Sequence, residues 1–275
     1  MIRLIGLDLD GTLLRQDKSI SSYTAEVLER AAKAGSVIVP VTGRPLSGLP
    51  QGVRKLPGVR YAITSNGAAV CDLAEEEILQ EVLMEPSKVL EVLACTEGID
   101  VIREVFTGGF GYHVPGDYER LRARFAGTPV MSYIDASRKK TDSLEDFVRN
   151  REEGFENISI MCTSFEDRER IRERLQGLED LHVILPWKTD LEITHRKAEK
   201  GDALLFLSAR LGINREETMA VGDSDNDLSL LQRAGLAIAM GNASPHIKEA
   251  ADYITEDNEH DGAAKAVSRF LLEDF

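Results

Sequence analysis

Five short apolar runs constrain the fold of this 275-residue chain more than any other feature. They lack the regular alternation of polar and apolar residues that a strand exposed on one face shows, so each predicts a strand buried on both faces. Buried strands of this kind are typical of a parallel sheet that helices cover on both sides. The predicted strands are residues 2–7, 37–41, 61–64, 219–221 and 236–240.

Helices are predicted between these strands. After the first strand, Ser21 or Ser22 would cap a helix whose apolar residues recur at helical spacing, and Gly35 would end it. A second helix is predicted to begin near Ala198 and to stop at Gly212, just before the strand at 219–221. The pattern predicts βαβ units and therefore an α/β fold with a doubly wound parallel sheet.

The middle of the chain has a different character. Residues 99–106 and 110–114 flank a Thr-Gly-Gly turn suited to a β-hairpin, and helices at 117–125 and 164–175 accompany strands at 157–162 and 182–185. This mixture predicts a separate α+β domain inserted into the first one. We place the inserted domain at residues 84–189, which leaves a discontinuous core domain made of residues 1–83 and 190–275.

Charge and cysteine content exclude several classes of function. The chain has 33 Lys and Arg against 47 Asp and Glu, a net charge of −14, so nucleic acid is not an expected partner. Its three cysteines, without CxxC spacing, are typical of a reduced protein with no zinc site. No apolar run is long enough for a membrane span or a signal peptide. We therefore expect a cytoplasmic protein that does not contact a membrane.

Polar or small residues follow several of the predicted strands. In open parallel sheets, ligands bind outside the carboxyl ends of the strands, so these segments should converge on one crevice. The segments are Asp8 to Asp10, Thr42-Gly43-Arg44, Ser65-Asn66-Gly67 and Gly222-Asp223.

Carboxylates dominate two of these segments. Asp8 and Asp10 would lie on one side if the strand geometry persists, and Asp223 and Asp227 follow another buried strand. A simple Asp-Gly turn would explain the first pair, but several clustered carboxylates need a cation, and oxygen ligands alone favour Mg²⁺. An EF-hand loop starting at Asp223 is excluded because Leu228 replaces its glycine.

Four ordered segments resemble the motifs of the haloacid dehalogenase superfamily. They are Asp8-Leu9-Asp10-Gly11-Thr12, Thr42-Gly43-Arg44, Lys200-Gly201 and Gly222-Asp223-Ser224-Asp225-Asn226-Asp227. Further segments resemble the Cof-type group, subfamily IIB, of sugar-phosphatase-like hydrolases: Ser65-Asn66-Gly67-Ala68, Leu191-Glu192-Ile193-Thr194, Ala239-Met240-Gly241-Asn242-Ala243 and Asp261-Gly262. The resemblance implies a Rossmannoid core with an α+β cap inserted between the second and third motifs.

The resemblance also implies catalytic roles. Asp8 would be the nucleophile that forms an aspartyl-phosphate, and Asp10 would be the general acid and base. Mg²⁺ would be held by Asp8, Asp223 and the backbone carbonyl of Asp10, with Asp227 in support. The phosphate would be bound by Thr42, Gly43, Lys200 and Asn226.

Other candidates concern the substrate. Arg44 would either reach the leaving group or pair with an acid of the core, and Asn66 is either a left-handed turn residue or a site contact. In the cap, Tyr112 and Trp187 offer aromatic faces that suit a sugar ring, although both residue types also serve packing.

The function that these resemblances imply is a Mg²⁺-dependent phosphatase. Its partner would be a small phosphorylated metabolite, in the first place a sugar phosphate. Two alternatives stay open: a phosphomutase that uses the same aspartyl-phosphate, and a non-catalytic sensor of phosphorylated metabolites.

Overall fold

The computed structural model describes residues 1–272 and divides them into two compact units. The core unit comprises residues 1–43, 49–80 and 199–272. The inserted unit comprises Arg44–Gly48 and Glu81–Ala198.

A five-stranded parallel sheet forms the centre of the core unit, in the order β14-β13-β12-β1-β2. All four residues of β1 are buried, as expected of a strand with helices on both faces. The α/β prediction is therefore confirmed. The strands are β1 (Leu4–Leu7), β2 (Val37–Pro40), β12 (Thr218–Gly222), β13 (Leu236–Ala239) and β14 (Tyr253–Ile254).

A smaller sheet of three strands continues from β2. It contains β3 (Tyr61–Thr64), β4 (Ala69–Asp72) and β5 (Glu77–Glu81), in that order. The sequence pattern predicts residues 61–64 as a strand of the parallel sheet, but β3 pairs antiparallel with β4. Two isolated parallel bridges, Ile38 to Val59 and Val41 to Ile63, still hold β3 and the residues just before it beside β2.

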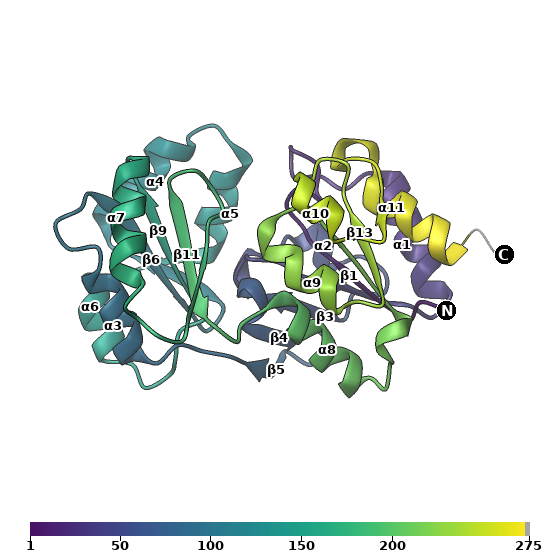
Figure 1. Ribbon diagram of the computed structural model, residues 1–275, viewed down its shortest axis with the longest axis horizontal. Coiled ribbons are helices and arrows are strands. Elements are labelled where there is room, and N and C mark those ends of the chain that lie inside the picture. The colour runs from purple at the N-terminus through teal and green to yellow at the C-terminus, as the bar shows by residue number, and fades with distance from the viewer. Residues whose placement is uncertain (273–275) are drawn as a thin grey trace. The chain divides into compact units, whose positions relative to one another are not determined.

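Helices cover the core sheet, and Figure 1 shows α8 and α9 on one side of the strands with α1 and α11 on the other. Ser21 is the N-cap of α1, because its side chain accepts a hydrogen bond from the Thr24 N–H at 2.9 Å. The helix beginning predicted near Ala198 lies at Lys200. The helices are α1 (Ser22–Lys33), α2 (Gln51–Arg54), α8 (Lys200–Arg210), α9 (Leu228–Arg233), α10 (Pro245–Glu249) and α11 (Gly262–Val267).

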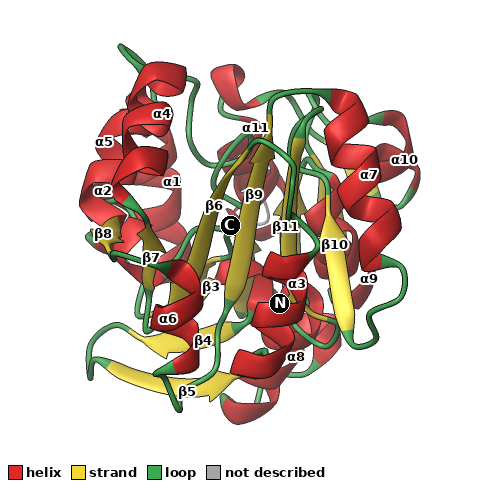
Figure 2. Ribbon diagram, turned by 90° about the vertical axis from the view of Figure 1, so that its left-hand side faces the viewer, coloured by secondary structure: helices red, strands yellow, loops and turns green. Residues whose placement is uncertain are grey.

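The inserted unit is built on a six-stranded sheet, and Figure 2 shows its strands side by side in the order β10-β11-β9-β6-β7-β8. Gly108 and Gly109 have φ angles of 58° and 75°, so they form the predicted hairpin turn between β6 and β7. The strands are β6 (Val101–Thr107), β7 (Phe110–His113), β8 (Arg138–Lys140), β9 (Asn157–Cys162), β10 (Leu181–Ile184) and β11 (Asp190–His195).

Helices lie on both faces of this second sheet. Val105 and neighbouring apolar residues pack with α3, α6 and α7, whereas Ile102, which points to the opposite face, packs with α4 and α5. The α+β prediction for the inserted region is therefore confirmed. The helices are α3 (Pro86–Ala94), α4 (Pro115–Phe125), α5 (Pro129–Ser137), α6 (Leu144–Arg149) and α7 (Phe165–Leu175).

The boundaries of the inserted unit differ from those predicted at 84 and 189. Strand β11 pairs with β9 and β10, so residues 190–198 lie with the inserted unit rather than with the core. The segment Arg44–Gly48 also belongs to this unit, because the backbone N–H of Ser47 donates to the carbonyl of Gly109 at 3.0 Å. Hydrogen bonds between residues so far apart leave no local pattern in the sequence.

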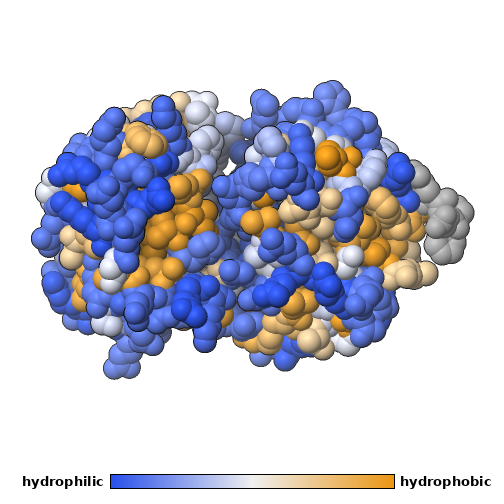
Figure 3. All heavy atoms as spheres, in the orientation of Figure 1, coloured by the Kyte–Doolittle hydropathy of each residue, from blue (hydrophilic) through white to orange (hydrophobic). Residues whose placement is uncertain are grey.

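Hydrophilic residues cover most of the face that Figure 3 shows, interrupted by smaller hydrophobic patches. Among residues 1–272, no helix combines the length and the apolar character that crossing a bilayer requires.

A buried ion pair lies within the inserted unit. Arg138 donates from Nε to Oε1 of Glu104 at 2.9 Å and from Nη2 to Oε2 at 3.3 Å. The two side chains are only 6% and 0% exposed, and the guanidinium stacks on the rings of Phe106 and Tyr133. Since both charges have left water, each depends on the other for compensation.

We predict that Arg138→Met destabilises the protein by about 3–5 kcal/mol, because the Glu104 carboxylate would remain buried without its partner. Urea unfolding, followed by circular dichroism and by the fluorescence of the single tryptophan, measures this loss. The double variant Arg138→Met, Glu104→Leu serves as the control and should recover most of it. A single-variant loss below about 1 kcal/mol would contradict the prediction, since that is the range of exposed pairs.

Candidate active site

The carboxyl ends of the neighbouring strands β1, β2 and β12 bring the predicted site residues of the core unit together. Asp8 directly follows β1 and Asp223 directly follows β12, and these two strands pair in parallel. Thr42 follows β2, and its backbone N–H donates to the carbonyl of Ile63 at 2.9 Å. Lys200 is the first residue of α8. Four segments that are distant in sequence therefore meet at one edge of the sheet.

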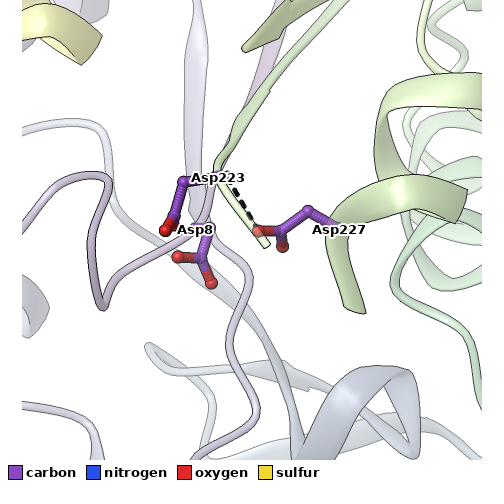
Figure 4. A group of neighbouring side chains, drawn as sticks. All are labelled: Asp8, Asp223 and Asp227. Atoms are coloured by element: carbon purple, nitrogen blue, oxygen red, sulfur yellow. Dashed lines mark hydrogen bonds between the residues drawn. The ribbon is translucent and has the colours of Figure 1, made fainter. Parts of the chain in front are cut away.

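Three carboxylates form the centre of this site, as Figure 4 shows. One oxygen from each of Asp8, Asp223 and Asp227 lies within 4.8 Å of the other two. Oδ2 of Asp8 is buried and has no hydrogen-bond partner. Three carboxylates whose oxygens lie this close together fit the oxygen ligands that a divalent cation such as Mg²⁺ or Mn²⁺ prefers.

Lys200 supplies positive charge next to these carboxylates. Its Nζ donates to Oδ1 of Asp8 at 2.7 Å and to Oδ1 of Asp227 at 2.6 Å, and its side chain is fully buried. Burial alone would lower the pKa of Lys200, but the attraction of Asp227 and Asp8 outweighs it and raises the pKa above its usual value. Lys200 is therefore charged at any physiological pH.

One lysine does not neutralise three carboxylates, and the pKa values show the excess of negative charge. Burial, followed by repulsion from Asp227, raises the pKa of Asp8 well above its usual value. The same two causes, in the same order, raise the pKa of Asp223 to about 6. A divalent cation among these oxygens would remove the repulsion and keep both groups ionised.

Asp227 supports the loop after β12. Its Oδ2 accepts hydrogen bonds from the backbone N–H groups of Asp223 at 3.0 Å and Ser224 at 3.1 Å, while its Oδ1 faces Lys200. A side chain at Gly222 would collide with it, since a Cβ there would lie 2.5 Å from the Cβ of Asp227. Both Asp227 oxygens thus accept hydrogen bonds from the protein, and its supporting role toward a metal stays a prediction.

Asp10 lies outside the cluster of three carboxylates. Its Oδ1 accepts a hydrogen bond from Nζ of Lys18 at 2.7 Å. Gly11 turns the chain with a φ of 91°, and a Cβ there would lie 2.5 Å from Oδ2 of Asp223. This glycine is therefore needed both for the left-handed turn and for the close approach of Asp223.

Three residues near the acids were not among the predicted site residues. Thr12 donates from its hydroxyl to Oδ1 of Asp223 at 2.9 Å, and Asn242 donates from Nδ2 to the carbonyl of Gly11 at 2.9 Å. Lys18 is the third, through its bond to Asp10. Thr12 and Asn242 stand inside the motif segments quoted above, which is a signal that could have identified them. Lys18 has no such signal.

The other phosphate-binding candidates, Thr42, Gly43 and Asn226, lie around Asn66, a candidate for contact with the substrate. Asn226 donates from Nδ2 to Oδ1 of Asn66 at 2.9 Å, and the backbone N–H of Asn66 donates to the carbonyl of Thr42 at 3.1 Å. Asn66 is 2% exposed and has a φ of 57°, so it is a left-handed turn residue that also lies among the site residues. Gly43 lies against its side chain.

The remaining candidates, Arg44, Tyr112 and Trp187, lie in the inserted unit. The Arg44 guanidinium is 4.6 Å from the ring centroid of Tyr133. The ring of Tyr112 lies 4.3 Å from that of Phe147, and Trp187 is 68% exposed. Whether Arg44, Tyr112 or Trp187 contacts a substrate stays a prediction.

The core-unit geometry suits the binding and transfer of an anionic group. Asp8 presents an unpartnered oxygen to the cluster, Lys200 is charged, and the acids can hold a cation. A carboxylate is a nucleophile that can form a covalent intermediate, and cationic groups around it stabilise a transferring phosphoryl group.

Comparison with known proteins agrees with this chemistry. The family model of the haloacid dehalogenase-like hydrolases matches residues 5–267. The Bacillus subtilis phosphatase YwpJ is 30% identical, over 98% of this chain and 100% of its own length. A second Bacillus subtilis protein, the 5-amino-6-(5-phospho-D-ribitylamino)uracil phosphatase YcsE, is 29% identical, over 98% of this chain and 96% of its own length.

A solved structure shows the same fold. The structure described as the haloacid dehalogenase subclass IIB sugar phosphatase BT4131 superposes with a TM-score of 0.83, at 24% identity, over 98% of each chain. Its fold is thus that of a core with an inserted domain of the type found here. With the motifs, the acid cluster and these relatives in agreement, the chain belongs to the haloacid dehalogenase superfamily and is a phosphatase of that family.

Proposed function

We propose that this protein is a Mg²⁺-dependent phosphatase that hydrolyses a small sugar phosphate through an aspartyl-phosphate on Asp8. The observation that carries the proposal is the unpartnered, buried Oδ2 of Asp8 beside Lys200, Asp223 and Asp227. An oxygen held in this way is available for attack on phosphorus, because no hydrogen bond of the protein must break first.

The acids would hold the cation. Asp8, Asp223 and the backbone carbonyl of Asp10 are its proposed ligands, and Asp227 keeps the loop of Asp223 in place. When bound, Mg²⁺ supplies the positive charge that lets a phosphate dianion approach the carboxylates. The group consists of three aspartates and contains no His or Cys. Such hard oxygen ligands favour Mg²⁺ over zinc or copper.

The proposed reaction uses two carboxyl groups of the core unit, those of Asp8 and Asp10. Oδ2 of Asp8 forms a bond to phosphorus while the bond to the substrate oxygen breaks, and Asp10 gives its proton to that leaving oxygen. A water molecule then attacks phosphorus, Asp10 takes its proton, and inorganic phosphate leaves with Asp8 restored. Lys200, Thr42, Gly43 and Asn226 bind the phosphoryl oxygens, which stabilises their negative charge.

The substrate class rests on the relatives and on the inserted unit. One relative is named for a phosphate ester that carries a ribityl chain, and one structural neighbour is described as a sugar phosphatase. The core residues named above serve the phosphate, so the inserted unit is the proposed source of selectivity for the rest of the substrate. Cytoplasmic location stays a prediction.

We predict that Asp8→Asn lowers turnover of p-nitrophenyl phosphate in Mg²⁺ by at least about 10³-fold, because an amide cannot form the aspartyl-phosphate. Release of p-nitrophenol and of inorganic phosphate, without any added sugar bisphosphate, measures the activity and separates hydrolysis from phosphomutase chemistry. Asp225→Asn is the matched control: its carboxylate is 70% exposed, and we expect activity within about twofold of the wild type. Full activity of folded Asp8→Asn would rule out the covalent route.

A second prediction concerns pH in the absence of divalent cations. The pKa of Asp223, about 6 in the folded protein, exceeds the usual value of about 4, so the folded form binds this proton more tightly than the unfolded form. This contribution to stability is complete below pH 4 and is lost as pH rises through 6, by about 3 kcal/mol.

Thermal unfolding with and without MgCl₂ tests whether stability falls as Asp223 loses its proton. We expect MgCl₂ to raise Tm more at pH 7.5 than at pH 5, since the cation needs the carboxylates without their protons. In metal-free buffer, Asp223→Asn should have a higher Tm than the wild type at pH 7.5. A larger effect of MgCl₂ at pH 5 would contradict the assignment of the acid cluster as the cation site.

A third prediction concerns selectivity. We expect Trp187→Ala to change the ratio of kcat/KM between a sugar phosphate and p-nitrophenyl phosphate by about fivefold or more, because the exposed ring of Trp187 is available to contact a sugar. Phe165→Ala, at an aromatic residue of the same unit that is 42% exposed, is the control. Tyr112 is less suitable, since it packs against Phe147. Equal losses on both substrates would count against a role of Trp187 in selectivity.

A further inference from the structure

The turn after β3 has an unusual backbone. Ser65, Asn66 and Gly67 have consecutive φ angles of 50°, 57° and 94°, all in the left-handed region. Ser65 and Asn66 carry side chains, which makes this conformation costly, and they are 0% and 2% exposed. A strained and buried turn of this kind persists where the surrounding structure holds it, often at a functional site.

Asn66 connects two segments that the proposed function assigns to phosphate binding. Its backbone N–H donates to the carbonyl of Thr42 at 3.1 Å, and its Oδ1 accepts from Nδ2 of Asn226 at 2.9 Å. Thr42 follows β2 and Asn226 lies in the loop after β12, so these two hydrogen bonds link segments that follow different strands. The left-handed backbone is what aims the N–H and the side chain at these two partners.

The side chain of Asn66 also explains the glycine at position 43. A Cβ at Gly43 would lie 2.9 Å from Oδ1 and 3.3 Å from Nδ2 of Asn66, and the three nearest atoms all belong to Asn66. Gly43 is not among the glycines with a positive φ, so its backbone would accept alanine. The space above Gly43 is therefore limited by the Asn66 amide and not by the conformation of the chain.

The same turn touches a third phosphate-binding segment. A Cβ at Gly67 would lie 2.4 Å from the backbone carbonyl group of Glu199, the residue that precedes Lys200. The backbone of the turn thus packs directly against the beginning of α8. Residues 65–67 contact all of the segments that carry Thr42, Gly43, Asn226 and Lys200.

We propose that Asn66 is a positioning residue, which holds the Thr42–Gly43 segment and the Asn226 side chain in one arrangement for the phosphoryl oxygens. It acts through these groups and does not itself contact the substrate. This inference rests on the proposed function. Asparagine suits the position because it tolerates the left-handed conformation and accepts the Asn226 bond without adding a negative charge beside the carboxylates.

Three variants test the inference: Asn66→Gly, Gly43→Ala and the double variant. Asn66→Gly keeps the left-handed backbone and removes the amide. Gly43→Ala keeps the N–H and adds a methyl group against the amide. We expect each single change to raise KM for p-nitrophenyl phosphate and Ki for inorganic phosphate by about 5- to 30-fold, the usual effect of losing one or two hydrogen bonds.

The double variant distinguishes positioning from independent effects. With the amide removed, the methyl group at position 43 meets no obstacle, so KM and Ki should equal those of Asn66→Gly alone. Multiplied losses in the double variant, or unchanged KM and Ki in Asn66→Gly, would overturn the inference. Should Asn66→Gly fail to fold, Gly43→Ala decides alone, because unchanged KM and Ki would show that the amide holds nothing there.

Two controls complete the design. Glu76→Gly, at another residue with a left-handed backbone in the turn between β4 and β5, should leave KM and Ki unchanged. If the wild type releases no phosphate from any ester in Mg²⁺, the proposed function fails. An active wild type with an unaffected Asn66→Gly variant shows instead that only the positioning inference fails.

Discussion

The buried ammonium group of Lys200 is the interaction on which the site depends. It lies between Oδ1 of Asp8 and Oδ1 of Asp227, and all three side chains are removed from water. Without this cation, two buried carboxylates would face each other in a medium of low dielectric, which is very costly. Lys200 offsets only part of the negative charge, so the pKa values of Asp8 and Asp223 stay raised.

The parallel sheet brings these groups to one edge. Strand β1 lies between β2 and β12, so the residues that follow the three strands come to the same edge. The left-handed turns at Gly11 and Asn66 then bend the chain around that edge. Strand β1 fixes the proposed nucleophile, Asp8, and the turn at Asn66 fixes groups that we propose to bind phosphate.

Much of this arrangement could be predicted from the sequence. The buried strands and the Ser21 cap have local signals, and the motifs identify Asp8, Thr42, Lys200 and Asp223. The assignment of residues 190–198 to the inserted unit could not be predicted, since it depends on strand pairing with β9. Lys18 was missed for the same reason: its bond to Asp10 depends on how the intervening turn folds back.

The order of the elements has a consequence for biosynthesis. The central strand β1 pairs with β12, with Leu4 opposite Thr218, so it waits on the ribosome for most of the chain before its second neighbour emerges. Residues 81–198 form a nearly continuous unit that can complete its own sheet earlier. During translation, the edge of β1 that later pairs with β12 therefore stays unpaired until residues 218–222 have emerged.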